Sequence, residues 1–242
     1  MCLNNRIALI TGAGGGIGSA IAVKIAQMGA DVILFGGNNL SKLEKTAAAV
    51  RNLGKRAEII AGDLTDVSFI ESGFNKALEL FGKIDILINN AGVATQGSLE
   101  NTSIDAFDKI MAINVRAPYA LIKCALPTLK KSDRASIINI ASVVAHAGYP
   151  NQSAYAASKH ALLGFTKSLA AEVYKDGVRV HIISPGGVYT DMVKVTRPDL
   201  TADGMILPED IADIVEFFLK NRNNAVVDEI MVHRLGKEPF LV

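Results

Sequence analysis

A tyrosine and a lysine stand four residues apart, at Tyr155 and Lys159, in a stretch with helical character. Residues i and i+4 lie on one face of a helix, so the phenol and the ammonium group should point the same way. The pKa of tyrosine is ordinarily about 10, and a nearby positive charge lowers it. Such a tyrosine can protonate a carbonyl oxygen, or accept an alcohol proton, while a hydride moves to or from a cofactor. The pair alone predicts little, because chance matches are common.

Polar residues that follow apolar runs strengthen this interpretation. Ser142 comes just after the run 134–141, and Asn89 and Asn90 stand where the run 84–88 ends. In open α/β sheets, ligands bind beyond the carboxyl ends of the strands. We therefore expect the Ser142 hydroxyl to hold a substrate oxygen beside the tyrosine.

Asn114 lies inside the long helical segment 103–130, although asparagine is a poor helix former. A local distortion of the helix there could let its backbone hold a water molecule. Taken singly, each asparagine is more often a turn or packing residue. Their joint placement around one edge of a sheet favours a functional role.

A glycine-rich segment, TGAGGGIG at 11–18, follows the first apolar run and precedes a helical pattern. Glycine suits this position because a Cβ would hold a pyrophosphate away from the backbone. The helix N-terminus then offers free N–H groups and the positive end of its dipole. The spacing, Gly-x3-Gly-x-Gly, differs from that of the commoner dinucleotide fold. It predicts a phosphate site, the alternative being a glycine-rich turn without a ligand.

Seven apolar runs of strand length alternate with longer helical patterns. The expected strands are 6–11, 31–35, 56–60, 84–88, 134–141, 178–184 and 226–232, and the expected helices lie near 17–28, 40–53, 67–81, 103–130, 153–175 and 208–221. Several runs are continuously apolar, as in parallel strands covered on both faces. The pattern predicts the α/β class: one doubly wound Rossmann domain over 1–242, with a seven-stranded parallel sheet flanked by helices.

The long segment 187–207 is apolar at its ends and polar in its middle. Exposed apolar residues on such a loop predict a lid that closes over substrate, the alternative being a loop packed on the core. With the loop after Ser142 it should line a mostly apolar pocket suited to a neutral carbonyl compound. The expected substrate contacts are Ser142, Val144, His146, Tyr149, Tyr155 and Met192. Lys194 and Arg197 could instead grip a carrier phosphate, which keeps a 3-oxoacyl thioester as the alternative substrate.

Composition argues against several other classes of protein. The chain has 242 residues and a formal net charge of +1, without a basic patch that would indicate nucleic acid or a membrane surface. Its two cysteines, Cys2 and Cys124, form no metal-binding pattern, so no metal site is expected. The sequence contains no recognisable signal peptide or spanning segment, and we expect a soluble, cytoplasmic protein.

Taken together, these motifs resemble the short-chain dehydrogenase/reductase family over essentially the whole chain. The matching residues are Thr11, Gly12, Gly16, Gly18, Asp63, Asn89 to Gly92, Asn114, Ser142, Tyr155, Lys159 and Pro185 to Thr190. The resemblance, to carbonyl reductases or 3-oxoacyl-acyl-carrier-protein reductases, implies an NAD(P)(H)-dependent enzyme that interconverts a carbonyl and a secondary alcohol. It also implies catalytic roles for Asn114, Ser142, Tyr155 and Lys159, with a proton relay from Tyr155 through the cofactor ribose, Lys159 and a water held by Asn114.

The same resemblance assigns residues to the cofactor. Asp63 is expected at the adenine, and Pro185 to Thr190 over the nicotinamide with Thr190 near the carboxamide. The full expected set is Gly12, Gly14, Gly15, Gly16, Ile17, Gly18, Gly37, Asn38, Asp63, Leu64, Asn90, Ala91, Gly92, Tyr155, Lys159, Pro185, Gly186, Val188 and Thr190.

The residues after the second strand bear on cofactor choice. An acidic side chain there would bind the ribose 2′-OH of NAD, but Gly36, Gly37, Asn38 and Asn39 stand in its place. Nothing there repels a 2′-phosphate, although no arginine pairs with it. The next helix should start near Asn38 or Asn39, and its N-terminus favours an anion. A weak preference for NADP(H) over NAD(H) follows.

Alternative functions and assembly complete the expectations. A catalytically silent NAD(P)-binding regulator should have lost Tyr155, Lys159 or Ser142, and all three are present. A nucleotide-sugar epimerase or dehydratase would need a longer substrate domain. The family resemblance implies that segments 103–130 and 153–175 pair across a two-fold axis, giving a homodimer or homotetramer.

Overall fold

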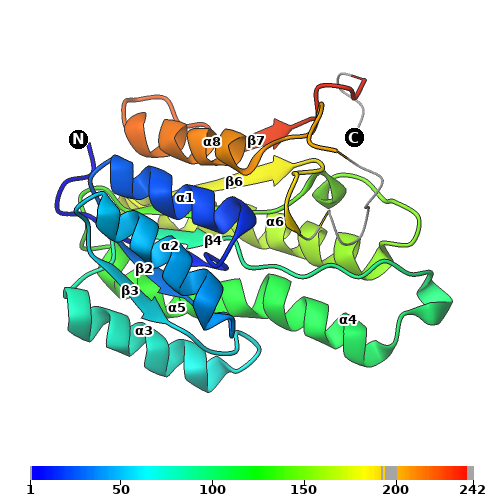
Figure 1. Cartoon of the computed structure of the whole chain (residues 1–242), viewed down its shortest axis with the longest axis horizontal. Helices are drawn as coiled ribbons and strands as arrows, with labels where there is room; N and C mark the ends of the chain where they lie inside the picture. The colour runs from blue at the N-terminus through cyan, green and yellow to red at the C-terminus, as the bar shows by residue number, and fades with distance from the viewer. Residues whose placement is uncertain (1, 192, 194–200, 239–242) are drawn as a thin grey trace.

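One parallel sheet organises the protein. The computed structural model describes residues 2–191, 193 and 201–238. The strands are β1 (Ile7–Thr11), β2 (Asp31–Phe35), β3 (Ala57–Ile60), β4 (Ile86–Asn89), β5 (Ser136–Ile140), β6 (Arg179–Pro185) and β7 (Glu229–Val232), in the order β3-β2-β1-β4-β5-β6-β7 (Figure 1). Every pairing within this sheet is parallel. The predicted fold class and the seven-stranded sheet are confirmed.

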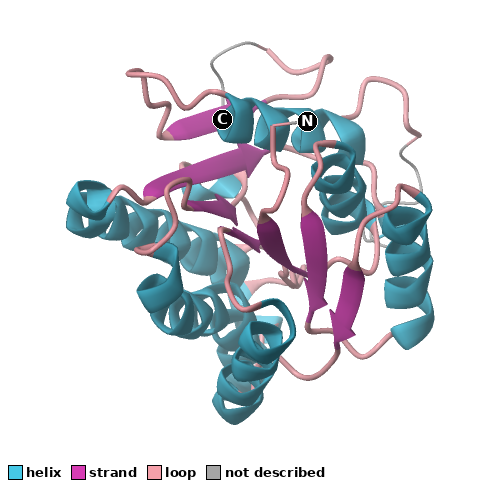
Figure 2. Cartoon of the chain, turned by 90° about the vertical axis from the view of Figure 1, so that its left-hand side faces the viewer, coloured by secondary structure: helices cyan, strands magenta, loops and turns pink. Residues whose placement is uncertain are grey.

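Helices cover both faces of this sheet, as Figure 2 shows. They are α1 (Gly16–Gln27), α2 (Leu40–Asn52), α3 (Val67–Phe81), α4 (Ile104–Met111), α5 (Ala117–Leu129), α6 (Ser153–Val173) and α8 (Pro208–Lys220). Ala8 and Ile10 of β1 pack in the core with α1, α2 and α8, whereas Ile7 and Leu9 pack with α3, α5 and α6. This two-sided burial explains the continuous apolar runs. In the described part of the chain, no helix is long and apolar enough to cross a membrane.

Most element boundaries lie within two residues of the expected ones, and two elements differ more. The expected helix 103–130 is interrupted between α4 and α5 by a π-helical turn, η2 (Ala112–Arg116). The expected strand 226–232 begins only at Glu229, because the side chains of Val226 and Val227 are 49% and 38% exposed rather than buried. The apolar run in the sequence thus extends beyond the strand and includes Val226 and Val227, which lie at the surface.

The expected lid has buried ends. Val188 and Ile206 form a parallel bridge, and Tyr189 N donates to Ile206 O at 2.8 Å. Val188, Met205 and Ile206 are all buried, so the expectation that these apolar residues are exposed is wrong. They are apolar because they anchor the base of the segment on the core. Met192, Lys194 and Arg197 lie outside the described residues.

Candidate active site

The glycine-rich turn between β1 and α1 contains two glycines that packing requires and one that faces open space. Gly12 has φ +67°, and a Cβ on it would lie 2.8 Å from Ala91 Cα. A Cβ on Gly18 would lie 2.4 Å from Gly12 O, whereas one on Gly15 would meet nothing within 4 Å. No side chain caps the helix that begins at Gly16. The turn therefore offers uncapped backbone N–H groups beside open space, which fits a pyrophosphate.

The two asparagines at the end of β4 do different things. Asn90 Nδ2 donates to Thr11 O at 3.0 Å and to Gly12 O at 3.2 Å, which ties the loop after β4 to the glycine turn. Asn89 is buried and donates through Nδ2 to Asn139 Oδ1 at 2.8 Å. Asn90 thus shapes the cradle, while Asn89 links β4 to β5 inside the core.

Tyr155 and Lys159 lie in the first two turns of α6, beside the carboxyl end of β5. The Lys159 ammonium group is buried, donates to Ile140 O at 2.9 Å, and lies 5.7 Å from the centroid of the Tyr155 ring. A Cβ on Gly92 would lie 3.6 Å from Lys159 Nζ, so the loop after β4 borders the ammonium group. Ser142 caps the short 3-10 turn η3 (Val143–Ala145) that follows β5. The structure therefore brings these predicted residues to one edge of the sheet.

The electrostatics of the pair differ from expectation. Burial raises the pKa of Tyr155, and a side-chain hydrogen bond with Ser142 acts in the opposite direction. Burial also lowers the pKa of Lys159, to about 8. The expectation that Lys159 lowers the pKa of Tyr155 is therefore wrong for the protein's own groups. Desolvation of the phenol outweighs the Ser142 hydrogen bond, and the ammonium group donates to the Ile140 carbonyl.

Asn114 lies in the π-helical turn η2, so the predicted distortion of the helix is confirmed. Its Oδ1 accepts from Val93 N and its Nδ2 donates to Val93 O, both at 2.9 Å. Nδ2 also donates to Ser158 Oγ at 3.0 Å, and that hydroxyl donates to Tyr155 O at 2.7 Å. Asn114 thus joins the loop after β4 to the turn that carries Tyr155. Sequence reasoning missed Ser158, whose position one residue before Lys159 was the available signal.

The remaining expected cofactor residues fall on the same edge of the sheet or beside it. A Cβ on Gly16 would lie 3.0 Å from Thr190 Cγ2, so the segment after β6 reaches the glycine turn. A Cβ on Gly37 would meet nothing within 4 Å, and Asn38 is exposed. Asp63 is exposed and accepts from Thr65 N at 2.8 Å, whereas Leu64 is buried beside Gly36.

The expected substrate residues are less uniform. Val144 is buried in η3, and Tyr149 is half-buried. His146 Nε2 lies 2.7 Å from Glu229 Oε1, so this nitrogen is bonded within the protein rather than free to face a substrate. Nothing in the residue spacing predicts a contact between His146 and Glu229 of β7, because the two lie 83 residues apart.

Comparison with known proteins agrees with this arrangement. Residues 6–201 match the family described as short chain dehydrogenase. The chain belongs to the short-chain dehydrogenase/reductase family, as predicted. Its members are oxidoreductases, and so is this protein.

Three relatives illustrate the similarity. An uncharacterized oxidoreductase of Thermotoga maritima is 40% identical over 188 residues, covering 77% of this chain and 73% of the relative. The 3-oxoacyl-[acyl-carrier-protein] reductase of Vibrio harveyi is 38% identical over 203 residues, with 84% and 81% covered. The crystal structure of a metagenomic short-chain oxidoreductase in complex with NADP is 31% identical, covers 96% of this chain and 98% of its own, and has a TM-score of 0.84.

Proposed function

We propose that this oxidoreductase interconverts a carbonyl and a secondary alcohol by hydride transfer, with Tyr155 as general acid/base. The observation that carries the proposal is the grouping of Ser142, Tyr155 and Lys159 at the carboxyl end of β5. When bound, the nicotinamide cofactor supplies or accepts the hydride, and its oxidised ring adds positive charge. Positive charge beside the Tyr155 phenol would lower its pKa and oppose the effect of burial.

Each residue has a distinct role in this proposal. The Tyr155 phenol gives a proton to the carbonyl oxygen or takes one from the alcohol, and the Ser142 hydroxyl holds that oxygen in place. Lys159, with its pKa lowered to about 8, passes the proton on toward a water beside Asn114. A group with that pKa can both hold and release a proton near neutral pH. This favours an enzyme over a catalytically silent regulator.

The variant Tyr155→Phe tests the chemistry. Turnover should fall by about 10²- to 10⁴-fold, the usual contribution of a general acid–base group, while cofactor affinity stays near that of the wild type. Tyr174→Phe is the matched control, since Tyr174 is 65% exposed at the end of α6. A Tyr155→Phe variant that keeps most of its kcat would contradict the mechanism.

The proposed substrate is a neutral, mostly apolar carbonyl compound, because the loop after Ser142 carries the half-buried side chains of Val143 and Tyr149. A 3-oxoacyl thioester is the second candidate, favoured by the similarity to the Vibrio harveyi reductase. The test compares an aliphatic or aromatic ketone with a 3-oxoacyl thioester, before and after changing Lys194 and Arg197 to Ala. Activity on the thioester alone that is lost in the double variant would establish the second candidate.

A preference for NADP(H) is supported by Lys42, a cation that the motif analysis did not identify. Lys42 lies in the first turn of α2, and its Cβ is 3.4 Å from where a Cβ on Gly14 would be, so it borders the glycine turn. Its Nζ pairs with Asp191 Oδ2 at 2.9 Å, and the two side chains are 53% and 66% exposed. Exposed pairs contribute little free energy, so a 2′-phosphate can replace Asp191 at small cost.

Binding measurements with both reduced cofactors test this preference. Lys42→Ala should raise the Kd for NADPH about tenfold, the loss of one charge-assisted hydrogen bond, and leave the Kd for NADH unchanged. Lys45→Ala, on the exposed face of the same helix, is the matched control. A wild-type Kd for NADH well below that for NADPH would overturn the preference.

The proposed assembly is a homodimer or homotetramer through α5 and α6. Tyr119 on α5 is 56% exposed and its ring lies 5.2 Å from that of Phe165 on α6, which forms an aromatic patch shared by both helices. Leu162 and Leu169 of α6 are buried in the core, so they are not part of this patch. Tyr119→Glu should shift the sedimentation coefficient toward the monomer, and a wild-type monomer at micromolar concentration would reject the assembly.

A further inference from the structure

Glu229 begins the edge strand β7 and belongs to none of the motifs that identify the family. One of its oxygens, Oε1, lies 2.7 Å from His146 Nε2 and accepts from Ser184 Oγ at 2.9 Å. The side chains of His146 and Glu229 are only 20% and 25% exposed. A single half-buried carboxylate oxygen thus joins two segments that are far apart in the sequence.

The first segment is the turn that starts at Ser142. Ser142 Oγ accepts from Val144 N at 3.4 Å, and Ala145 N donates to Ser142 O at 2.9 Å. His146 closes the same turn, with its N–H donating to Val143 O at 3.0 Å. Because Ser142 and His146 are the two ends of one hydrogen-bonded turn, a displacement of His146 is transmitted to the Ser142 hydroxyl.

The second segment continues from β6 over the edge of the sheet. Ser184 immediately precedes Pro185, and Gly186 N donates to Val232 O at 2.8 Å. β7 pairs with β6 from Ile182 to Pro185, and the Glu229 carboxylate and the Val232 carbonyl add a side-chain contact and a contact just beyond the strand. Thr190, farther along the segment, reaches the glycine turn.

We propose that Glu229 is a positioning residue, which fixes the Ser142 turn and the Pro185 segment relative to each other. The inference rests on the proposed function, in which Ser142 holds the substrate oxygen. Reacting groups have to be held within about 0.5 Å of their productive positions, and a displacement of about 1 Å can cost about 10²-fold in rate. The Glu229 carboxylate meets this requirement because it accepts hydrogen bonds from both segments. An aliphatic side chain at this position would accept neither.

Three variants of Glu229 and its partner measure the coupling. Glu229→Leu should lower kcat about 10- to 100-fold and raise the Kd for NADPH by a smaller factor, because the Pro185 segment shifts whereas the backbone of the glycine turn keeps its own contacts. Glu229→Gln keeps an acceptor oxygen and should recover most of that loss. His146→Phe keeps a ring but removes the donor, so it should reproduce the loss and add nothing in the Glu229→Leu background.

Hydrogen exchange gives a readout that does not depend on turnover. The amides of Ala145 and His146, which close the turn, should exchange faster in Glu229→Leu, whereas amides of β1 should be unchanged. Asp228→Asn, at the exposed neighbouring carboxylate, is the matched control and should alter neither kcat nor exchange. If Glu229→Leu fails to fold, His146→Phe and Ser184→Ala each remove one of the two hydrogen bonds and carry the same prediction.

The outcomes separate this inference from the proposed function. Wild-type kcat and unchanged exchange in Glu229→Leu overturn the positioning role, even if Tyr155→Phe is inactive. Equal losses in Glu229→Gln and Glu229→Leu, accompanied by an equally large loss of NADPH affinity, also overturn it, because they indicate a general loss of structure. If Tyr155→Phe keeps its turnover, the proposed function is wrong. Faster exchange in Glu229→Leu would then show only that Glu229 holds the Ser142 turn in place.

Discussion

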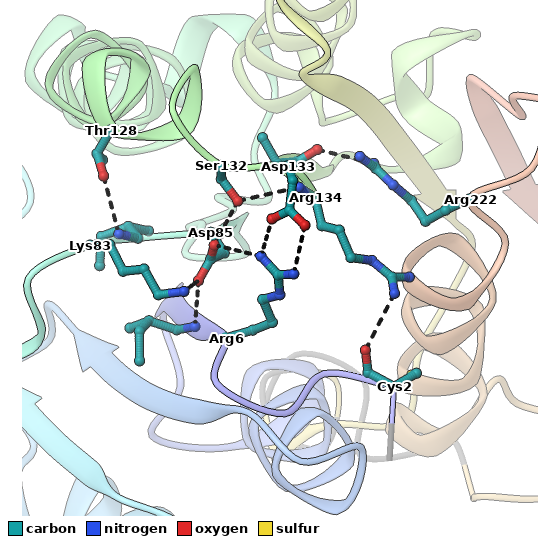
Figure 3. Close-up of polar contacts among 12 residues, drawn as sticks. Cys2, Arg6, Lys83, Asp85, Thr128, Ser132, Asp133, Arg134 and Arg222 are labelled. Atoms are coloured by element: carbon teal, nitrogen blue, oxygen red, sulfur yellow. Dashed lines mark hydrogen bonds and ion pairs between the residues drawn. The ribbon is translucent and has the colours of Figure 1, made fainter.

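The two ends of the parallel sheet each contain a buried charged side chain, and the two differ in how many hydrogen-bond and ion-pair partners surround the charge. At the amino end, the Asp85 carboxylate is 1% exposed and has several donors (Figure 3): Ile7 N at 3.0 Å, Ser132 Oγ at 2.6 Å, Lys83 Nζ at 3.1 Å and Arg6 Nη1 at 3.3 Å. At the carboxyl end, the buried Lys159 ammonium group has a single hydrogen-bond acceptor among the described residues, Ile140 O. The first charge is surrounded by partners and the second has few.

The pKa values respond accordingly. Burial alone would raise the pKa of Asp85, but hydrogen bonds from Ser132, Ile7 N and Lys83 outweigh it and the pKa is lowered. Burial lowers the pKa of Lys159 to about 8, in spite of its hydrogen bond to Ile140 O. The amino end is therefore organised for stability, whereas the carboxyl end retains a charge that costs stability and can take part in proton transfer.

Replacing Lys159 should have the largest effect. Lys159→Met should lower turnover about 10²-fold or more while raising the free energy of unfolding at pH 7, because a buried charge is removed. The folded pKa is depressed, so the penalty is fully present below pH 8 and disappears as the pH rises toward 10.5. The stability advantage of the variant should shrink by about 3 kcal/mol across that window.

Urea unfolding between pH 7 and 10.5 measures this difference directly. Lys45→Met, at an exposed site on α2, should show neither the loss of turnover nor the pH-dependent difference. The prediction is refuted if Lys159→Met is less stable than wild type at pH 7 and the difference is the same at every pH. That result would mean that the buried Lys159 charge does not lower the stability of the wild type.

Replacing Asp85 should have the opposite signature. Asp85→Asn removes the charge that Arg6 and Lys83 pair with, so the free energy of unfolding should fall by about 3 kcal/mol while kcat stays near wild type. Because the folded pKa of Asp85 is depressed, wild type should lose this stability as the pH falls below about 4, and the variant should lose less. A large loss of kcat in a folded Asp85→Asn protein would mean that the amino end of the sheet influences catalysis at its carboxyl end.

The comparison also explains what the sequence could predict. The glycine spacing, the Tyr155–Lys159 pair and Ser142 are local patterns with known positions relative to strands, so the sheet and the grouping of these residues followed from them. The network around Asp85 is different, because its members come from before β1, before β4 and after α5. The contacts of Asp85 with Ser132 and Arg6 join residues 47 and 79 positions apart and carry no local periodicity.

The same limit applies at the carboxyl end. Glu229 contacts His146 across 83 residues, and Lys42 contacts Asp191 across 149, so neither pair was visible in the motifs. The sign of the Tyr155 pKa shift was mispredicted for a related reason. Spacing along a helix gives the direction of the lysine but neither the degree of burial nor the competing Ile140 carbonyl.

A smaller effect is expected from Ser132, which donates one of the hydrogen bonds to Asp85. Ser132→Ala should lower the free energy of unfolding by about 1.5 kcal/mol, the contribution of one hydrogen bond to a charged group. The remaining donors keep the Asp85 carboxylate ionised, so the pH range in which the free energy of unfolding falls on acidification should change only slightly. A loss as large as that of Asp85→Asn would show that Ser132 is the principal partner and that the lysine and arginine contribute little.

The smallest effect is expected from Asp133, which shares Arg6 with Asp85 but lies at the surface. Arg6 Nη2 donates to Asp133 Oδ2 at 3.0 Å, and the Asp133 side chain is 75% exposed compared with 1% for Asp85. Water and salt screen an exposed pair, so Asp133→Asn should leave the urea midpoint within the scatter of replicate measurements. Repeating the measurement at low and high ionic strength sharpens the comparison, because any contribution of an exposed pair fades with added salt whereas that of Asp85 persists. If Asp133→Asn destabilises the protein as much as Asp85→Asn, then the stability at the amino end of the sheet comes from pairing with Arg6. Burial of the carboxylate among several donors would then not be the cause.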